Sequence, residues 1–262
     1  MDSTVLELVF LSKKRTDILL FLKEGPKTIA EINEFLNLSS VAVLPQLKKL
    51  RDNSLILKKK NVYSLSPLGI ATVGRTQPMV ELLNVFGTQY DYWTSHAIEC
   101  IPVPFLKRIG DLSNCTFSKP PDKTCLFEPH KEFIENLKKS NKIGGIASIF
   151  NPFFPSFFLG LSKMGIDISI IVTSQVYERI IGEFKDIVRE FLKFENGILY
   201  VCSQKIEFSY VVTDRFLSLS LPFSDGTYDH QRDVLCFDST AIRWGEDLFA
   251  YYRNISDKIT EI

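Results

Sequence analysis

Apolar side chains in the first seventy residues recur at helical spacing in successive segments. From 8 to 22 they fall three or four positions apart with charged residues between them, which predicts one helix that Gly25 ends. Thr28, with Glu31 three positions later, is typical of a capping box and predicts a second, short helix. A turn at 37–40 then leads into a third helix.

The third helix has the position of a recognition helix, and its cap is Ser39 or Ser40. The apolar positions predict an inward face of Val41, Leu44, Leu47 and Leu50. The outward positions are Gln46, Lys48, Lys49 and Arg51. Pro45 lacks a backbone donor, so we expect a kink there.

Two short strands, at 55–58 and 62–65, follow the third helix and are joined by Lys59, Lys60 and Asn61. The ribbon therefore carries three consecutive lysines near its tip, counting Lys58. Three helices followed by such a ribbon are typical of a winged helix-turn-helix, a fold that docks on duplex DNA.

Charge is distributed unevenly along the chain. Residues 1–75 hold twelve Lys and Arg against seven Asp and Glu, a net charge of +5, and the remaining residues carry −5. Such a distribution is expected if residues 1–75 alone neutralise the phosphates of a nucleic acid. The alternative is that the lysines form a solvated hairpin and that the winged helix binds a protein partner.

Within a DNA-binding domain at 1–75, each outward residue has an expected role. We expect Ser40, Val41 and Gln46 to lie nearest the bases in the major groove. Phosphate contacts are expected from Ser39, Lys48, Lys49, Lys58, Lys59 and Lys60.

Residues 76–119 are predicted to form a helical connector, with extended, aromatic character around Tyr90–Trp93 and 101–104. Helices that follow a wing commonly pair across a two-fold axis, because a palindromic operator requires two heads. We therefore expect a homodimer, whose interface lies in the connector or further along the chain.

From 120 to 262 short apolar runs alternate with helical patterns, which predicts an α/β sheet domain and an α/β class for the chain as a whole. The expected strands lie at 125–127, 143–150, 167–173, 198–202, 208–213, 216–221 and 234–237. The expected helices lie at 129–139, 157–164, 175–192 and 239–259. Ligands of such folds bind at the carboxyl ends of strands.

An aromatic run at 150–158 follows one of these strands and opens a helix. One interpretation is an effector pocket with Phe150 as a wall and Asn151 and Ser156 as polar contacts, to which Asp214 adds a carboxylate. The alternative, which the abundance of Phe favours, is an ordinary core or dimer contact. We expect no cofactor, because the glycines at 143–146 match neither dinucleotide nor Walker spacing.

The five cysteines, at 100, 115, 125, 202 and 236, are scattered and contain no Cys-x-x-Cys pair. A disulfide framework is typical of short secreted chains, and a closed zinc site needs paired spacing. We therefore expect buried free thiols and no metal site, with a redox role left open for Cys202 and Cys236.

Four segments carry a resemblance to a known family: Leu-Pro-Gln-Leu-Lys-Lys-Leu at 44–50, Gly-Ile-Asp-Ile-Ser-Ile-Ile-Val-Thr at 165–173, Asp-Gly-Thr-Tyr-Asp at 225–229 and Ala-Ile-Arg-Trp-Gly-Glu-Asp-Leu-Phe at 241–249. The chain resembles archaeal transcriptional regulators of the methanogenesis-regulator (FilR-like) type. The resemblance implies an ArsR-like winged helix followed by a middle and C-terminal sensor domain. It does not imply which effector the second domain binds.

A weaker likeness, in fold only, is to one half of a phospholipase-D-like domain over 146–172 and 208–244. If Asp214 took the aspartate place of that motif, the nucleophilic His and the phosphate-binding Lys would fall on Glu207 and Ser209. Neither side chain can perform those roles, so a domain of this descent would have no catalytic motif.

No run of about 18 apolar residues occurs, and the first residues lack a basic signal region, so we expect a cytoplasmic protein that does not enter membranes. The sequence favours a sequence-specific, DNA-binding transcriptional regulator controlled by a small-molecule or protein effector. Two alternatives remain: an enzyme that processes small molecules or phosphodiesters and carries a winged-helix appendage, and a protein-interaction scaffold.

Overall fold

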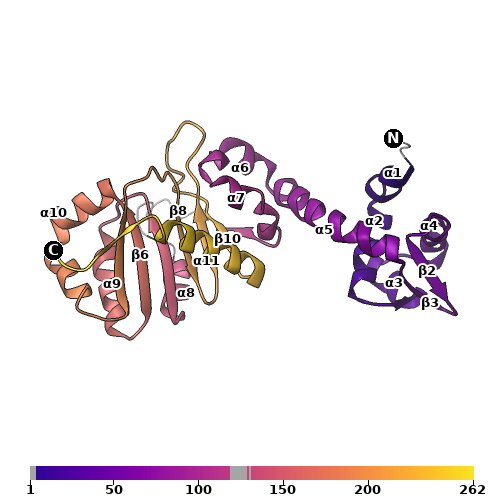
Figure 1. The fold of residues 1–262 in the computed structure, drawn as a ribbon, viewed down its shortest axis with the longest axis horizontal. Helices are drawn as coiled ribbons and strands as arrows, with labels where there is room; N and C mark the ends of the chain where they lie inside the picture. Colours follow the sequence, from indigo (N-terminus) through magenta and orange to yellow (C-terminus); the bar gives the residue numbers. More distant parts are fainter. Residues whose placement is uncertain (1–3, 119–128, 130) are drawn as a thin grey trace. The chain divides into compact units, whose positions relative to one another are not determined.

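A helical domain with a small antiparallel sheet precedes a larger mixed α/β domain (Figure 1). The computed structural model describes residues 4–118, 129 and 131–262. The chain divides into two compact units, Met1–Val80 and Glu81–Ile262. The predicted strand at 125–127, with Cys125, lies outside the described residues.

The first unit has the element order of a winged helix-turn-helix. Its elements are α1 (Thr4–Phe10), α2 (Lys13–Phe21), the 3₁₀ turn η1 (Leu22–Glu24), β1 (Lys27–Thr28), α3 (Ile29–Leu36), α4 (Ser40–Asp52), β2 (Ile56–Lys59), β3 (Val62–Leu65) and α5 (Pro67–Thr88), which continues into the second unit. The three strands pair antiparallel in the order β1-β3-β2. The side chains of Ile18, Ile32 and Leu47 meet in one apolar core.

The helix predicted at 8–22 is wrong, because the structure has two helices, α1 and α2, in its place. Ser12 occupies the N-cap position of α2 in an extended conformation, and its side chain makes no cap hydrogen bond. The Arg15 Nε donates to the Leu8 carbonyl at 2.5 Å, and the Thr16 hydroxyl donates to the Val9 carbonyl. Side chains of α2 thus satisfy carbonyls in the last turn of α1, which periodicity alone does not reveal.

The capping box at the start of α3 is confirmed. The Thr28 amide donates to Glu31 Oε2 at 2.7 Å, and the Glu31 amide donates to the Thr28 hydroxyl at 3.3 Å. Hydrogen bonds from the Thr28 side chain and backbone hold the pKa of Glu31 below its usual value. These reciprocal bonds fix the helix that precedes α4.

The second unit is built on an eight-stranded mixed sheet of order β11-β7-β6-β5-β8-β9-β10-β4. Its strands are β4 (Thr116–Phe117), β5 (Lys142–Ala147), β6 (Asp167–Thr173), β7 (Gly197–Cys202), β8 (Ser209–Thr213), β9 (Leu217–Ser220), β10 (Val234–Cys236) and β11 (Asp257–Ile259). Among the strands of the described residues, the pairs β5–β6 and β6–β7 are parallel and the other pairs of this sheet are antiparallel. The pairing changes to antiparallel on both sides of these three strands, between β5 and β8 and between β7 and β11.

Helices cover both faces of this sheet (Figure 1). They are α6 (Tyr90–Ser95), α7 (Val103–Leu106), α8 (Lys131–Lys138), α9 (Phe153–Lys163), α10 (Ser174–Phe191) and α11 (Ser239–Arg253), with 3₁₀ turns η2 (Ile98–Cys100) and η3 (Ile109–Leu112). Alternate residues of a strand point to opposite faces. On β6, Ile170 joins the core under α8, α9 and α10, whereas Ile171 joins the core under α6, α7 and α11.

Two predictions about the second unit are wrong. The helix expected at 239–259 ends at Arg253, and β11 then pairs antiparallel with β7. The segments expected to be extended, around Tyr90–Trp93 and 101–104, form α6 and the start of α7. The helices there bury Tyr92 and Phe105, so tertiary packing overrides the local preference of aromatic residues for extended structure.

Close packing of α11 on the sheet requires a glycine. A Cβ on Gly245 would lie 2.8 Å from Leu217 Cδ1 and 3.0 Å from Val212 Cγ2, whereas a Cβ on Gly160 in α9 would meet no atom within 4 Å outside its own helix. We expect Gly245→Ala to lower the free energy of unfolding by about 1–3 kcal/mol through overpacking. The matched control Gly160→Ala should raise it by about 0.5–1 kcal/mol. Urea unfolding measures both, and equal effects would contradict the close approach of α11.

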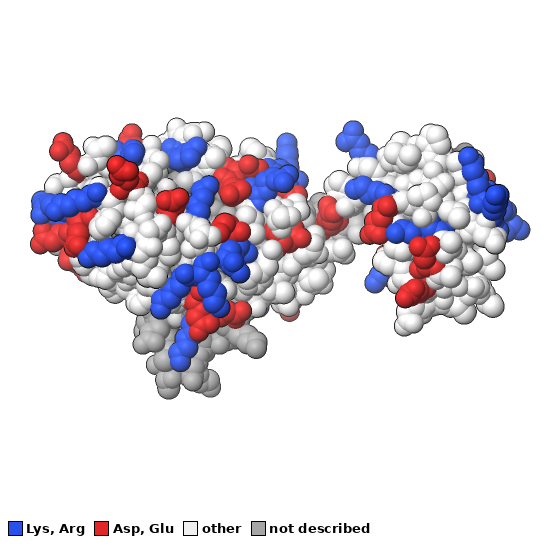
Figure 2. Space-filling model, turned by 90° about the horizontal axis from the view of Figure 1, so that it is seen from below, with Lys and Arg blue, Asp and Glu red and all other residues white. Residues whose placement is uncertain are grey.

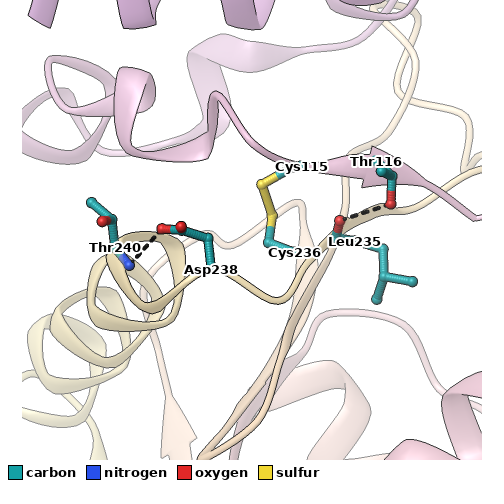
Figure 3. The surroundings of a disulfide bond; sticks show 6 residues. All are labelled: Cys115, Thr116, Leu235, Cys236, Asp238 and Thr240. Atoms are coloured by element: carbon teal, nitrogen blue, oxygen red, sulfur yellow. Dashed lines mark hydrogen bonds between the residues drawn. A yellow bond between two sulfur atoms is a disulfide. The ribbon is translucent and has the colours of Figure 1, made fainter. Parts of the chain in front are cut away.

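The expectation of free thiols is wrong for two of the cysteines. A disulfide joins Cys115 to Cys236, which are 121 positions apart (Figure 3). Cys115 precedes β4 and Cys236 ends β10, and these strands pair antiparallel. The side chain of Thr116 also donates to the Leu235 carbonyl at 3.3 Å. Of the described cysteines, Cys100 and Cys202 are free.

Candidate functional site

The exposed face of α4 differs from the predicted one. Val43, Leu47 and Leu50 point into the core, whereas Val41 is 84% exposed and Leu44 is 46% exposed. The prediction that Val41 and Leu44 face inward is therefore wrong. The helix is rotated about its axis so that Val43, which is fully buried, faces the core in their place. The outward position of Val41 suits an apolar contact with a thymine methyl group.

The start of α4 is arranged as a helix N-terminus that offers backbone amides. Ser39 is the N-cap, in extended conformation, and its side chain makes no cap hydrogen bond. The Ser40 hydroxyl accepts a hydrogen bond from Asn33 Nδ2 at 2.7 Å. The exposed Ser39 and the amides of the first turn are thus the groups placed for a phosphate, while Ser40 links α4 to α3.

Gln46 has a partner that the sequence did not reveal. Arg15 Nη1 donates to Gln46 Oε1 at 3.1 Å, and Arg15 Nη2 donates to the Glu7 carbonyl at 3.2 Å. Reading adenine in a bidentate manner requires both the oxygen and the nitrogen of a glutamine amide. While Arg15 donates to Oε1, that oxygen has one lone pair left for a base, and the orientation of the Gln46 amide is set by Arg15.

The wing forms as predicted, with a shorter turn. Lys59 is the last residue of β2 and pairs with Val62, so the turn contains only Lys60 and Asn61. Lys60 has φ 55°, a left-handed conformation. The Lys58 ammonium lies 5.4 Å from the centre of the Tyr63 ring, whereas Lys59 and Lys60 are exposed.

The cationic side chains of α4 and the wing are available to an anion. Lys48, Lys49, Lys58, Lys59 and Lys60, here called the head lysines, are all exposed. Within the described part of the chain, none of them forms an ion pair with a carboxylate. Figure 2 shows Lys and Arg gathered at the end of the first unit where the β2–β3 hairpin lies in Figure 1. The predicted phosphate-binding lysines therefore lie on a surface that suits that role.

The second unit contains a cavity of about 340 Å³ at the carboxyl end of β5. Phe150 and Asn151, two of the predicted pocket residues, line it. Asn151 Oδ1 accepts a hydrogen bond from the Phe153 amide at 2.9 Å, at the start of α9. The aromatic run at 150–158 thus forms both cavity wall and helix start.

Two predicted pocket residues lie elsewhere. Ser156 is exposed on α9 and does not line the cavity. Asp214 follows β8, which runs antiparallel to β5. The residue therefore lies beside the amino end of β5, whereas the cavity lies at its carboxyl end. The Asp214 carboxylate accepts hydrogen bonds at 3.0 Å from both the amide and the side chain of Asn141. The assignment of Asp214 to the pocket is therefore wrong, because the antiparallel direction of β8 carries this residue away from the cavity.

Asp214 holds the start of β5 in place, and this role is testable. Burial raises the pKa of Asp214, but hydrogen bonds from Asn141 and Lys142 outweigh it and lower that pKa. A lowered pKa contributes stability that is present at neutral pH and is lost as pH falls through the folded-state value. We expect Asp214→Asn to lower the urea midpoint at pH 7 and the difference from wild type to shrink in acid. A difference that grows in acid would contradict this role.

Two family models match this arrangement of domains. The N-terminal domain of methanogenesis regulatory protein FilR1 matches residues 4–84, and the middle domain of the same protein matches residues 126–255. The chain belongs to the FilR1 methanogenesis regulatory protein family. The first match contains the winged helix, and the second contains the cavity. The expected family is therefore confirmed for both units.

Methanogenesis regulatory protein FilR1 of Methanothrix harundinacea (strain 6Ac) is 26% identical to this FilR1 family member over 260 residues. The alignment covers 95% of this chain and 57% of the relative, so the chain spans a little over half the relative's length. A solved structure of TrmBL2, described as an archaeal chromatin protein with a novel mode of DNA binding, aligns over 98% of both chains with a TM-score of 0.45 and 13% identity.

The described part of this FilR1 family member holds no group of three or more His, Cys, Asp or Glu side chains placed to bind a metal ion. Among the same residues, no helix is both long and apolar enough to span a bilayer. The phospholipase-D-like origin of the second unit stays a prediction, since no finding tests it.

Proposed function

We propose that this chain is a sequence-specific DNA-binding regulator of transcription, acting in the cytoplasm, whose second unit responds to an effector. The observation that carries the proposal is the exposed, cation-rich surface formed by the head lysines on a winged helix-turn-helix. Membership of a family described as regulatory supports it. In this account α4 enters the major groove, with Val41 nearest the bases, and the wing contacts phosphates.

We propose that the chain binds DNA as a homodimer, because two heads on a two-fold axis match a palindromic operator. Leu68 and Met79 support a contact through the first part of α5. They are eleven positions apart, which places them on the same side of a helix, and each is 51% exposed. Light scattering of the purified chain measures its mass, and a monomer at every concentration would contradict this part.

The test of sequence-specific binding is enrichment from a pool of random duplexes by the full chain, followed by sequencing. We expect a shared motif to emerge. The variant Val41→Lys, which replaces an exposed apolar contact by a cation, should change that motif or abolish it while retaining salt-sensitive binding. If the wild-type pool shows no shared motif, the claim of sequence specificity is wrong.

A further inference from the structure

The cavity in the second unit exists because small side chains occupy neighbouring strands on one sheet face. Gly145 and Ala147 of β5, Ser209 of β8, and Ser218 and Ser220 of β9 all line it. The intervening positions of β8 and β9 carry large side chains that fill the opposite core. Alternation along each strand thus leaves the face toward α8, α9 and α10 partly unfilled. A volume of about 340 Å³ falls in the range of small-molecule sites, roughly 300–1,000 Å³.

One wall of the cavity is polar and hydroxyl-rich. Ser218 is only 5% exposed as a residue, and its side chain lines the cavity. Ser209, by contrast, already shares a hydrogen bond of 3.0 Å with Ser148, and Ser220 donates to Asp233. Because those two hydroxyls are already bonded to protein groups, Ser218 is the serine of this wall that is available to a ligand.

A second, smaller chamber of about 80 Å³ adjoins this cavity and is almost wholly apolar. The two share seven wall residues, which are Ala147, Ile149, Phe150, Asn151, Phe154, Phe158 and Ile170. Beyond them, Val176, Ile180 and Val188 of α10 close the chamber. Its chemistry suits a hydrocarbon chain and offers no partner for a polar group beyond Asn151.

The charges that line the larger cavity argue against an anionic ligand. Asp229 and Asp233 line it, and its described wall contains no Lys or Arg. Asp229 Oδ2 lies 3.1 Å from His96 Nε2 and 3.7 Å from Arg232, outside the wall, so this carboxylate is already paired. His230, which also lines the cavity, has partners of its own. An anion would therefore lose its hydration without meeting a dedicated cation.

We propose that the joined cavities bind a small aliphatic amphiphile, with its uncharged head on the Ser218 hydroxyl and its hydrocarbon tail in the chamber against α10. The inference deepens the effector-responsive role proposed for the second unit. Binding of such a compound is measured without DNA, so failure of this proposal and failure of the DNA-binding proposal remain distinguishable.

The test is isothermal titration of the full chain with octanamide, octanoate and octylammonium, which share a tail and differ in head charge. We expect octanamide to bind most tightly. Shortening it to hexanamide should weaken binding by roughly fourfold for each methylene removed, because each buried methylene contributes about that factor. Nonspecific association of an amphiphile with the protein surface would not show this preference for an uncharged head.

Two variants locate the site. Ile180→Phe fills the chamber and should abolish binding of octanamide, whereas Ile255→Phe, at a position 38% exposed on the surface, should leave binding unchanged. Ser218→Ala removes the hydroxyl and should weaken the binding of octanamide by about fivefold. Its control is Ser256→Ala, whose hydroxyl bonds the Tyr252 carbonyl away from the cavity.

Binding of octanamide that depends on tail length and is lost in Ile180→Phe but kept in Ile255→Phe would support the proposal. Binding of octanoate or octylammonium as tight as that of octanamide would overturn the assignment of an uncharged head. Absence of binding by all three compounds to folded wild-type chain would overturn the site itself. So would equal affinities for wild type, Ile180→Phe and Ser218→Ala.

Discussion

Replacing Lys48, Lys49, Lys59 and Lys60 together by alanine should lower the affinity for every duplex by orders of magnitude. Each lysine that neutralises a phosphate releases counterions, so the slope of log affinity against log salt should become less negative by about 0.9 for each lysine replaced, or nearly four in all. Lys58 is retained because its ammonium lies against the Tyr63 ring. The reduction in affinity should be the same for specific and random duplexes, since phosphates carry no sequence information.

The wing contribution can be separated from that of α4. Lys59→Ala with Lys60→Ala alone should flatten the slope by about two. A matched control removes four exposed lysines of the second unit, namely Lys138, Lys139, Lys185 and Lys193. It changes the net charge of the chain equally, and its salt slope should stay close to that of wild type. If the control variant makes the slope less negative by as much as the head variant does, binding depends on overall charge and not on this surface.

Breaking the disulfide should have the largest effect on stability in the second unit. A bond across 121 positions restricts the unfolded chain strongly, and loss of such a bond typically costs about 2–5 kcal/mol. We expect a reducing agent to lower the free energy of unfolding of wild type by that amount, which appears as a lower urea midpoint. Cys115→Ala should show the lowered midpoint with or without the reductant. Alanine is chosen over serine at position 115 because a serine would place a hydroxyl beside Cys236, which is fully buried.

The control for the disulfide is Cys100→Ala, which removes a free thiol. This variant should remain as sensitive to reductant as wild type. Cytoplasmic proteins usually keep their thiols reduced, so mass spectrometry of alkylated protein should show how much of the bond is formed in the cell. Identical midpoints of wild type with and without reductant would show that the bond does not contribute to stability.

Local patterns predicted those elements whose burial follows the sequence closely. The strand at 167–173 is mostly apolar and is predicted correctly at both ends, because both of its faces are covered by helices. The capping box of Thr28 and Glu31 was equally visible, since it depends on residues three apart. The wing was found for the same reason.

The misplaced elements and residues depend on partners far away in the sequence. The break between α1 and α2 follows from bonds that Arg15 and Thr16 make to α1 carbonyls. Asp214 was assigned to the wrong edge because the direction of β8 is set by its pairing with β5. The disulfide needed the pairing of β4 with β10, which two scattered cysteines do not signal.

The candidate site was predicted by residue type more successfully than by geometry. The head lysines are exposed as expected, because long cations seldom lie inside a protein. The phase of α4 was misjudged by assigning Val41 and Leu44 to the core, since the helix repeats every 3.6 residues and Val43 takes the inward place. The contact between Arg15 and Gln46 spans 31 positions and leaves no local signal.

The central claim is that the winged helix binds duplex DNA through its cations. Fluorescence anisotropy of the full chain, with a duplex from the enriched pool and a scrambled duplex of equal composition, tests it most directly across a salt series. We predict tighter binding to the enriched duplex, and affinities for both duplexes that fall linearly on logarithmic axes as salt rises. Absence of binding at low salt, or binding that salt does not weaken, would contradict the account.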